Sequence, residues 1–440
     1  MIKKFEQWLW YAFLFSIPIG TRYIFNYDPV TFVEWQAVSV YLTDVLFAGL
    51  LIFWLQSGKK FVFELADWLL VGVLAVAAAS VFYAIDRNVA LFQWLKLAEG
   101  AALFWYVKNY AVERFGLART FEVIFYGGLF QAVIAIGQFT AQRSLGFQFA
   151  GESVLSPALT GIAAFIVHGE KIIRAYGTTP HPNVLAAYLF VALYAFYQRY
   201  LYERMENARM FPRWKEVALL GAYGITLFGF FLTFSRTLIG LWFGLFLLRA
   251  PIVLMARHLR NAINIPANRC RLAGILITGA AVIGLFLTLY WPYVINRASI
   301  SSGDEAIQLR VLYNQEAVKG SIHWFGVGIG NFVPWLMRQD VRLPLGEYQP
   351  VHNIYLLLYS EIGLIGAILF GTFLAALCVQ WCLRTEFKKL YHLSLGLVFA
   401  GLLAAGLFDH FLLTIQAGRL LLWFTAGLIA SRFSLIIKTS

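Results

Sequence analysis

The sequence is poor in charge. Only 13% of its 440 residues are Asp, Glu, Lys or Arg, whereas soluble domains average about 25%. This shortage excludes an ordinary soluble globular domain, because a water-facing surface needs more charged side chains than the chain contains. Hydrophobic residues make up 60% of the chain and the mean hydropathy is +0.70, so we expect lipid to solvate much of the protein.

Cysteine is also scarce, and the chain contains only Cys270, Cys378 and Cys382. They fall in or beside apolar runs, so no disulfide framework is expected. Cys378 and Cys382 are one helical turn apart, but two thiols without a histidine or further cysteines make a poor zinc site. We expect no bound metal ion and no cofactor.

Acidic residues are outnumbered, with 23 Asp and Glu against 35 Lys and Arg, for a net charge of +12. A basic excess is typical of nucleic-acid-binding proteins when it gathers on one face. Here the basic residues are spread over short loops between apolar runs. We therefore expect membrane lipids, and no nucleic acid, as partners.

Long apolar runs predict an all-α polytopic membrane protein. A spanning helix needs about 20 apolar residues, and the runs are continuous rather than alternating, which favours helices over a β-barrel. The first run follows Lys3 and Lys4 and lacks a convincing cleavage site, so we interpret it as a retained helix. Twelve spans are predicted, at residues 6–22, 38–55, 67–84, 90–107, 121–140, 183–200, 217–234, 237–255, 272–291, 353–381, 391–411 and 418–436.

The distribution of Lys and Arg predicts the orientation. Twelve spans put both termini on one side. Assigning that side as cytoplasmic gives 22 basic residues inside against 12 outside, and Lys96 lies within a span. The chain is then one transmembrane domain, 1–440, with a large outer loop at 292–352 between the ninth and tenth helices. Within this loop Arg297–Lys319 predicts an amphipathic surface helix. In the outer loop 141–182, the stretch Leu159–Val167 is too short to span and is expected at the membrane interface.

Arginines in the outer loops are the first candidate site residues. Arg174 opens a segment that ends at Asn183, a residue suited to cap the sixth span. A helix start with free N–H groups would favour an anion there. Arg236 joins two long spans through almost no loop, so its charge must snorkel to the surface or be paired. Both arginines fit phosphate binding, because guanidinium geometry matches phosphate oxygens; contacts with lipid headgroups are the alternative.

The large outer loop carries a third arginine and a glycine-rich segment. Arg310 lies on the expected surface helix, where an anionic-lipid contact is the alternative to a substrate-binding role. The glycines of Trp324–Phe332 match a nucleotide fingerprint only superficially, because no βαβ unit surrounds them. We interpret them as positions that permit a tight backbone path near the membrane.

His352 stands at the mouth of the tenth span, directly after this loop, and is followed by Asn353. An unperturbed imidazole titrates near ~6.5, so a neutral proton acceptor is available at pH 7. Glu361 lies about 13 Å further along the helix at 1.5 Å per residue, too deep to act on the same bond. Asp409 ends the eleventh span, where it either pairs with Arg419 or orients a catalytic group. A capping or packing role is the alternative for His352.

Together these motifs resemble the O-antigen ligase and polymerase superfamily of bacterial polysaccharide enzymes. The similarity covers about residues 174–425. The order, spacing and common outer position of several short motifs make the combination fairly specific. These motifs are Arg174-x-x-Gly177 with Pro182-Asn183, Ser235-Arg236, Arg310 followed by Phe325–Phe332, and His352-Asn353-x-Tyr355 with Glu361-x-Gly363 and Gly366.

The resemblance implies a GT-C-type fold and a metal-independent, inverting glycosyltransferase in the bacterial inner membrane, with its site facing the periplasm. It implies an undecaprenyl-diphosphate-linked glycan as donor. It also implies that Arg236 and Arg310 bind the diphosphate, with Arg174 in support, and that His352 is the acid–base residue. Asn353, Glu361 and Asp409 would have supporting roles.

Several acceptors stay open at this point. Lipid A–core would make the protein an O-antigen ligase in lipopolysaccharide biosynthesis, which the long loop before His352 slightly favours. A second lipid-linked repeat unit would make it a polymerase, and a protein serine or threonine would make it an O-oligosaccharyltransferase. Outside this class, a polysaccharide flippase or another transporter would need charged residues inside several spans, whereas the polar motifs concentrate at the outer face.

Overall fold

The computed structural model of the protein describes residues 1–27, 32–202, 212–255, 266–298, 305–319, 324–339, 342–384 and 390–431. These residues are mostly helical, and the chain falls into two compact units. Unit 1 comprises Met1–Thr21, Phe115–Ile300 and Thr385–Gly401. Unit 2 comprises Arg22–Arg114, Ser301–Arg384 and Leu402–Ser440. The two units are interleaved along the sequence.

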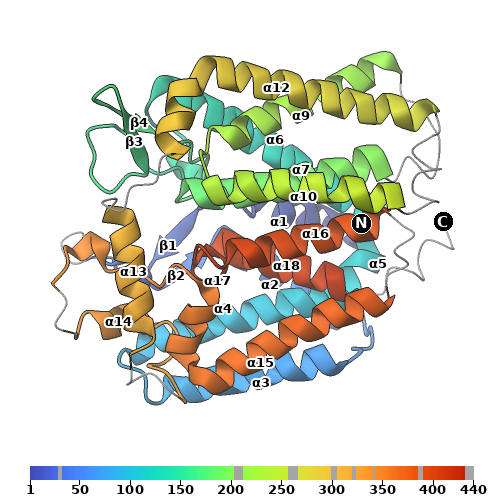
Figure 1. Ribbon diagram of the computed structural model, residues 1–440. Helices are drawn as coiled ribbons and strands as arrows, with labels where there is room; N and C mark the ends of the chain where they lie inside the picture. Colours follow the sequence, from blue (N-terminus) through green and yellow to red (C-terminus); the bar gives the residue numbers. More distant parts are fainter. Residues whose placement is uncertain are drawn as a thin grey trace. The chain divides into compact units, whose positions relative to one another are not determined.

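Unit 1 is a bundle of apolar helices with one strand hairpin. Strands β3 (Ala164–Val167) and β4 (Glu170–Ile173) pair antiparallel, with Ala164 opposite Ile173. In Figure 1 the hairpin lies at the end of the bundle where α6 ends and α7 begins. The helices are α1 (Ile2–Ser16), α6 (Leu117–Ala141), α7 (Pro182–Tyr197), α9 (Arg213–Phe231), α10 (Arg236–Met255), α12 (Pro266–Ala298) and α16 (Leu390–Ala405), the last with its residues up to Gly401 in this unit.

Small residues let the central helices of unit 1 approach closely. Gly128 of α6 lies against the Cβ of Ala192 on α7, so a methyl group at Gly128 would collide with it. Gly229 of α9 lies in the same way against Ala132 of α6. Small-residue contacts are the usual way for membrane helices to pack, since van der Waals contact replaces the hydrophobic driving force.

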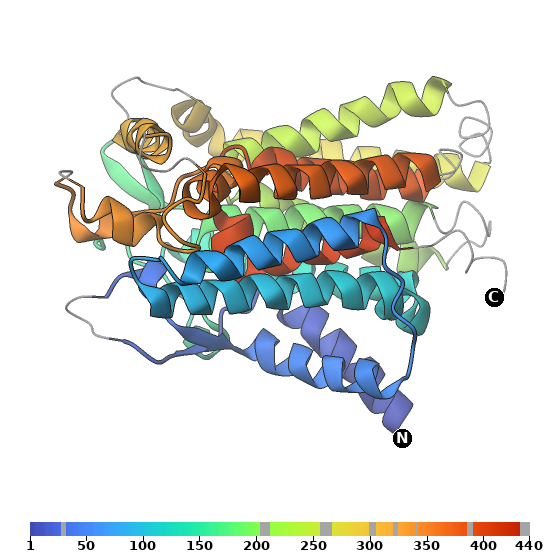
Figure 2. The same ribbon diagram turned by 90° about the horizontal axis from the view of Figure 1, so that it is seen from below.

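Unit 2 contains a second helix bundle and most of the large loop. Figures 1 and 2 show α3, α4 and α15 running side by side, with α13 and α14 at the end where α15 begins. Strands β1 (Arg22–Ile24) and β2 (Ser39–Tyr41) form an antiparallel pair. The helices are α2 (Leu42–Gln56), α3 (Leu65–Val81), α4 (Arg87–Tyr106), α13 (Glu305–Ala317), α14 (Phe332–Leu336), α15 (Ile354–Arg384), α17 (Phe411–Thr414) and α18 (Gln416–Ala430), with α5 (Val112–Phe115) at the unit's edge.

A helix overlaps each of the twelve predicted ranges. Among the described residues, four helices are long and apolar enough to cross a membrane: Leu117–Ala141, Pro182–Leu201, Asn268–Arg297 and Ile354–Leu383. The helical character and the suitability for a membrane are therefore confirmed. The count of twelve spans, the GT-C-type fold and the orientation stay predictions.

Three details differ from the sequence predictions. The two strand pairs were not expected, and Leu159–Val167 ends in strand β3 because it pairs with β4. The surface helix predicted at Arg297–Lys319 begins only at Glu305, and Arg297 instead lies in the last turn of α12. Helix α12 is kinked at Tyr290, two residues before Pro292, whose ring cannot fit a regular helix interior.

Candidate functional site

Arg174 is a buried connecting residue of unit 1. Its Nε donates to the Thr233 carbonyl oxygen and its Nη2 donates to Asn183 Oδ1, both at 2.7 Å. These bonds tie the start of α7 to the turn between α9 and α10. The prediction that Asn183 caps α7 was wrong: the helix begins at Pro182, and His181 is the cap, with its Nδ1 accepting from the Asn183 N–H at 3.1 Å.

Arg236 begins α10 and lies half-buried beside an apolar cavity in unit 1. Its Nη1 donates to the carbonyl oxygen of Arg297 at 3.3 Å, which links the start of α10 to the end of α12. The cavity has a volume of about 240 Å³ and lies between α9, α10 and α12. Arg236 and Arg297 line this cavity, and its other lining residues are all apolar: Phe231, Phe234, Ile239, Phe243, Ile283, Phe286, Leu287 and Val294. The almost wholly apolar surface, with two arginines among its lining residues, suits the chain of an anionic lipid.

The remaining predicted site residues belong to unit 2, where the glycine-rich segment packs against a break in α15. Gly363 has φ 70° and ψ −175°, which interrupts the helix. The backbone of Trp324 and Phe325 passes so close that a Cβ at Gly363 would overlap it, and Gly326 meets the backbone of Glu361 in the same way. The N–H groups of Val327 and Gly328 donate to the carbonyls of Ser360 and Glu361 at 2.9 Å. The tight backbone path predicted for these glycines is confirmed.

Gly363→Ala is expected to destabilise the protein by about 1–3 kcal/mol, because a methyl group would meet backbone atoms at a positive φ. Thermal unfolding of the purified protein in detergent measures the change. Gly371→Ala in the same helix is the matched control, because a Cβ there meets nothing within 4 Å. An equal midpoint for both variants would show that the break in α15 does not need glycine.

His352 lies within a group of aromatic rings contributed by separate segments of unit 2. The Tyr313 ring of α13 stacks on its imidazole at 5.9 Å between centroids, with the planes 10° apart. His410 meets the same imidazole edge-on at 4.8 Å, and Trp35 meets His410 edge-on at 4.9 Å. His410 is held in place because its Nδ1 lies 2.7 Å from Thr414 Oγ1. His352 is thus held between rings from two distant parts of the sequence, and Trp35 supports one of them.

The surroundings of His352 keep its imidazole neutral. Burial lowers the pKa of His352 below its ordinary value of 6.5 and Arg310 acts in the same direction, whereas Asp409 and the Pro350 carbonyl oppose the shift. Its Nδ1 is buried and has no hydrogen-bond partner within the described part of the chain. A neutral imidazole with an unoccupied nitrogen can accept a proton from a hydroxyl group. Arg310, Asp409 and His352, predicted separately, therefore come within electrostatic reach of one another.

Three other predicted residues have clear structural contacts. Asn353 caps α15, since its Oδ1 accepts from the Tyr355 and Leu356 N–H groups at 2.9 and 3.2 Å. The carboxylate of Glu361 faces the N–H groups of Gly330 and Phe332. Asp409 Oδ1 accepts from the His410 N–H at 2.8 Å, at the start of α17.

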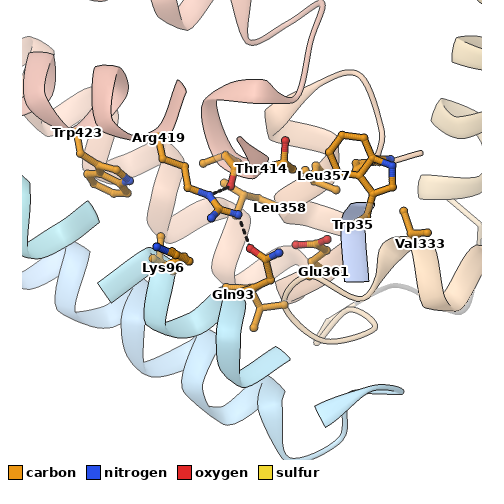
Figure 3. A pocket seen from close by; sticks show the side chains of 15 residues that line it. Trp35, Gln93, Lys96, Val333, Leu357, Leu358, Glu361, Thr414, Arg419 and Trp423 are labelled. Atoms are coloured by element: carbon orange, nitrogen blue, oxygen red, sulfur yellow. Dashed lines mark hydrogen bonds between the residues drawn. The ribbon is translucent and has the colours of Figure 1, made fainter. Parts of the chain in front are cut away.

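The alternative of an Asp409–Arg419 ion pair was wrong. Arg419 Nε instead donates to the Leu413 carbonyl at 2.5 Å, and its Nη2 donates to Gln93. Figure 3 shows these two bonds beside a cavity of about 50 Å³, which Lys96 and Glu361 also line. Since Leu413 belongs to α17, Arg419 stabilises the short helix that follows Asp409 and His410.

Sequence reasoning missed Tyr313, His410 and Trp35. Tyr313 is three residues after Arg310, so the helical spacing that puts both on one face of α13 could have indicated it. His410 directly follows Asp409 but carried no separate signal. Trp35 lies far from both in the sequence, and nothing local distinguishes it from other membrane-interface tryptophans.

No family model matches the chain, and no curated protein matches it by sequence. Within the described ranges, no three His, Cys, Asp or Glu side chains gather as metal ligands would.

Proposed function

We propose that the protein is a membrane glycosyltransferase that transfers a glycan from undecaprenyl diphosphate to an acceptor hydroxyl group. The observation that carries the proposal is the environment of His352 at the start of α15. The imidazole is buried and neutral, its Nδ1 has no hydrogen-bond partner among the residues that the structure describes, and both cationic Arg310 and anionic Asp409 act on it. Such a group is suited to take a proton from a hydroxyl while a nearby cation stabilises a leaving phosphate.

The apolar cavity beside Arg236 supports the choice of donor. A polyprenyl chain is apolar along its length and carries its charge at one end, and the cavity has aromatic and aliphatic walls with Arg236 and Arg297 on its lining. Diphosphate is a good leaving group that needs charge stabilisation more than protonation, so arginines are sufficient for that role. No metal ion is required by this chemistry.

Lipid A–core is the proposed acceptor, which makes the protein an O-antigen ligase of the bacterial inner membrane with its site on the periplasmic side and both termini in the cytoplasm. The glycan profile of a deletion strain tests this function. Loss of the glycan from lipid A–core, with lipid-linked glycan of normal length accumulating, is the expected result. Loss of chain length would assign a polymerase instead, and loss of glycan from proteins would assign a protein O-oligosaccharyltransferase.

One observation favours a second candidate, a transporter. The sequence suggested that charged residues concentrate at the outer face, but Lys96, Asp44 and Glu99 form a cluster inside unit 2. Charged groups among membrane helices often line transport pathways. Failure of lipid-linked glycan to reach the periplasm in the deletion strain would support this candidate.

A further inference from the structure

The buried charge of unit 2 is not explained by glycosyl transfer. Lys96 of α4 is 5% exposed, and its ammonium group pairs with Asp44 of α2 and, at 2.9 Å, with Glu99 one turn further along α4. Asp44 also accepts from the Tyr41 N–H at 3.0 Å, in the first turn of α2. The carboxyl groups of Asp44 and Glu99 lie within hydrogen-bonding reach of each other. Two carboxylates this close repel each other unless a proton lies between them.

Gln416 of α18 bridges the two carboxyl groups of this cluster. Its side chain is 4% exposed, and its Nε2 lies 2.7 Å from Asp44 Oδ1 and 3.3 Å from both Glu99 Oε1 and Thr43 Oγ1. Its Oε1 is buried and has no hydrogen-bond partner in the part of the chain that the structure describes. Turning the amide over would offer Oε1 to the Thr43 hydroxyl but would remove a donor from both carboxyl groups. The orientation that donates to both carboxyl groups holds them close together around one amide and one ammonium group.

The charges that face the cluster leave it one positive charge short. With every group ionised, four carboxylates face three cations among the described residues, and an uncompensated buried charge costs several kcal/mol. The four carboxylates are Asp44, Glu99, Glu361 of α15 and Glu34, and the three cations are Lys96, Arg419 and Arg22. Arg22 pairs with Glu34 at 2.6 Å, and its Nη1 also donates to the Tyr41 hydroxyl, which lies beside Lys96. One bound proton or cation would neutralise the set.

We propose that Asp44 and Glu99 share one exchangeable proton and form a buried proton-binding site. Proton uptake is a simple transfer, in which an O–H bond forms at one carboxyl oxygen and an O–H or N–H bond breaks on a water molecule or an imidazolium. The cavity of about 50 Å³ beside Lys96 and Arg419 has room for water. It is also lined by Thr414, whose hydroxyl group contacts His410 Nδ1.

This cavity extends from Lys96, which pairs with both carboxyl groups, to Thr414, which contacts His410. Under the proposed transferase function, and resting on it, the site would have to release its bound proton before it could take up the one that His352 removes from the acceptor. Proton binding itself does not depend on that function, because the charge imbalance is a property of the folded unit. The experiments below therefore use no transfer reaction.

A second lysine cluster in unit 2 provides a matched control. Lys108 pairs with Asp67 and, at 3.3 Å, with Glu64 at the start of α3. Asp67 also accepts from Trp105 Nε1 at 3.0 Å and from the Glu64 N–H at 2.6 Å. These donors occupy both oxygens of the Asp67 carboxyl group. Glu64→Gln therefore changes a similar cluster that we expect to hold no shared proton.

Infrared difference spectroscopy of the full chain in lipid nanodiscs tests the proposal. At neutral pH the wild type is expected to show the carbonyl stretch of a protonated carboxylic acid, shifted in D₂O and lost on alkaline titration. Glu64→Gln should retain this band, whereas Glu99→Gln and Asp44→Asn should lose it, since either change balances the charges. A band that remains in both Glu99→Gln and Asp44→Asn would overturn the proposal. A band that sodium removes at constant pH would also overturn it, because it would indicate a metal-cation site.

The pH dependence of unfolding provides a second measurement. A folded state that binds a proton which the unfolded state has already released loses stability as pH rises. The wild-type unfolding midpoint should therefore fall relative to that of Glu99→Gln between neutral and alkaline pH. A constant difference across that range would mean that the cluster only clamps the helices. If Glu99→Gln does not fold, the infrared comparison of the wild type with Asp44→Asn tests the shared proton: the band should be present in the wild type and absent from Asp44→Asn.

Discussion

Replacing His352 with glutamine is expected to slow glycan transfer by roughly 10²–10⁴-fold, the usual loss when a positioned base is removed. Glutamine keeps hydrogen-bonding capacity but cannot take the proton from the acceptor hydroxyl. The measurement is transfer by purified protein at matched folded concentration. If the variant retains most activity, His352 only positions a substrate. If less protein folds but each folded molecule turns over at the normal rate, His352 has a packing role.

Two neighbouring substitutions should move the pH profile in opposite directions. Transfer requires neutral His352, so activity falls as pH drops through the pKa of that group. Arg310 lowers this pKa, so Arg310→Gln should shift the acidic limb to higher pH. Asp409 raises it, so Asp409→Asn should shift the limb to lower pH. A limb that stays in place in both variants would remove His352 as the titrating group, whatever the absolute rates.

Arg236→Ala is expected to reduce transfer by about 10²–10³-fold, comparable to losing one preorganised group that stabilises charge in a transition state. Arg236→Lys should recover only part of this loss, because lysine provides a point charge without the two-pronged guanidinium geometry. The rate of single-turnover transfer from a lipid-diphosphate donor is the measurement, supported by donor binding to the purified variants.

Arg143→Ala is the control for Arg236, since Arg143 is an exposed arginine of the same unit that follows α6. It should transfer glycan at nearly the wild-type rate. Equal rates for Arg236→Ala and the wild type, at equal expression, would exclude Arg236 from the donor site. A loss of folded Arg236→Ala protein would instead trace to its hydrogen bond with the Arg297 carbonyl at the junction of α10 and α12.

Arg310 and Asp409 were chosen from separate motifs, and the structure brings both within electrostatic reach of His352. Their partners were less accessible. Tyr313 shares a helical face with Arg310, but His410 meets His352, and Trp35 meets His410, only through the folding of separate loops. Asn183 was assigned as a helix cap because its residue type fits, yet His181 precedes Pro182 and takes the position instead. Local preference could not rank two residues, separated only by Pro182, that both have side-chain acceptors.

Lys96 marks the limit of reasoning from the sequence. Its place within an apolar run was evident, but its partner Asp44 lies 52 positions away. Gln416, which donates to Asp44, lies 320 positions from Lys96, and no local pattern specifies how these helices pair. The sequence by itself determined the helical, membrane-suited character of the protein, because hydrophobic length and periodicity act within single segments. Only the tertiary structure decided which polar side chains meet, because a buried charge is stabilised by neighbours that distant segments bring to it.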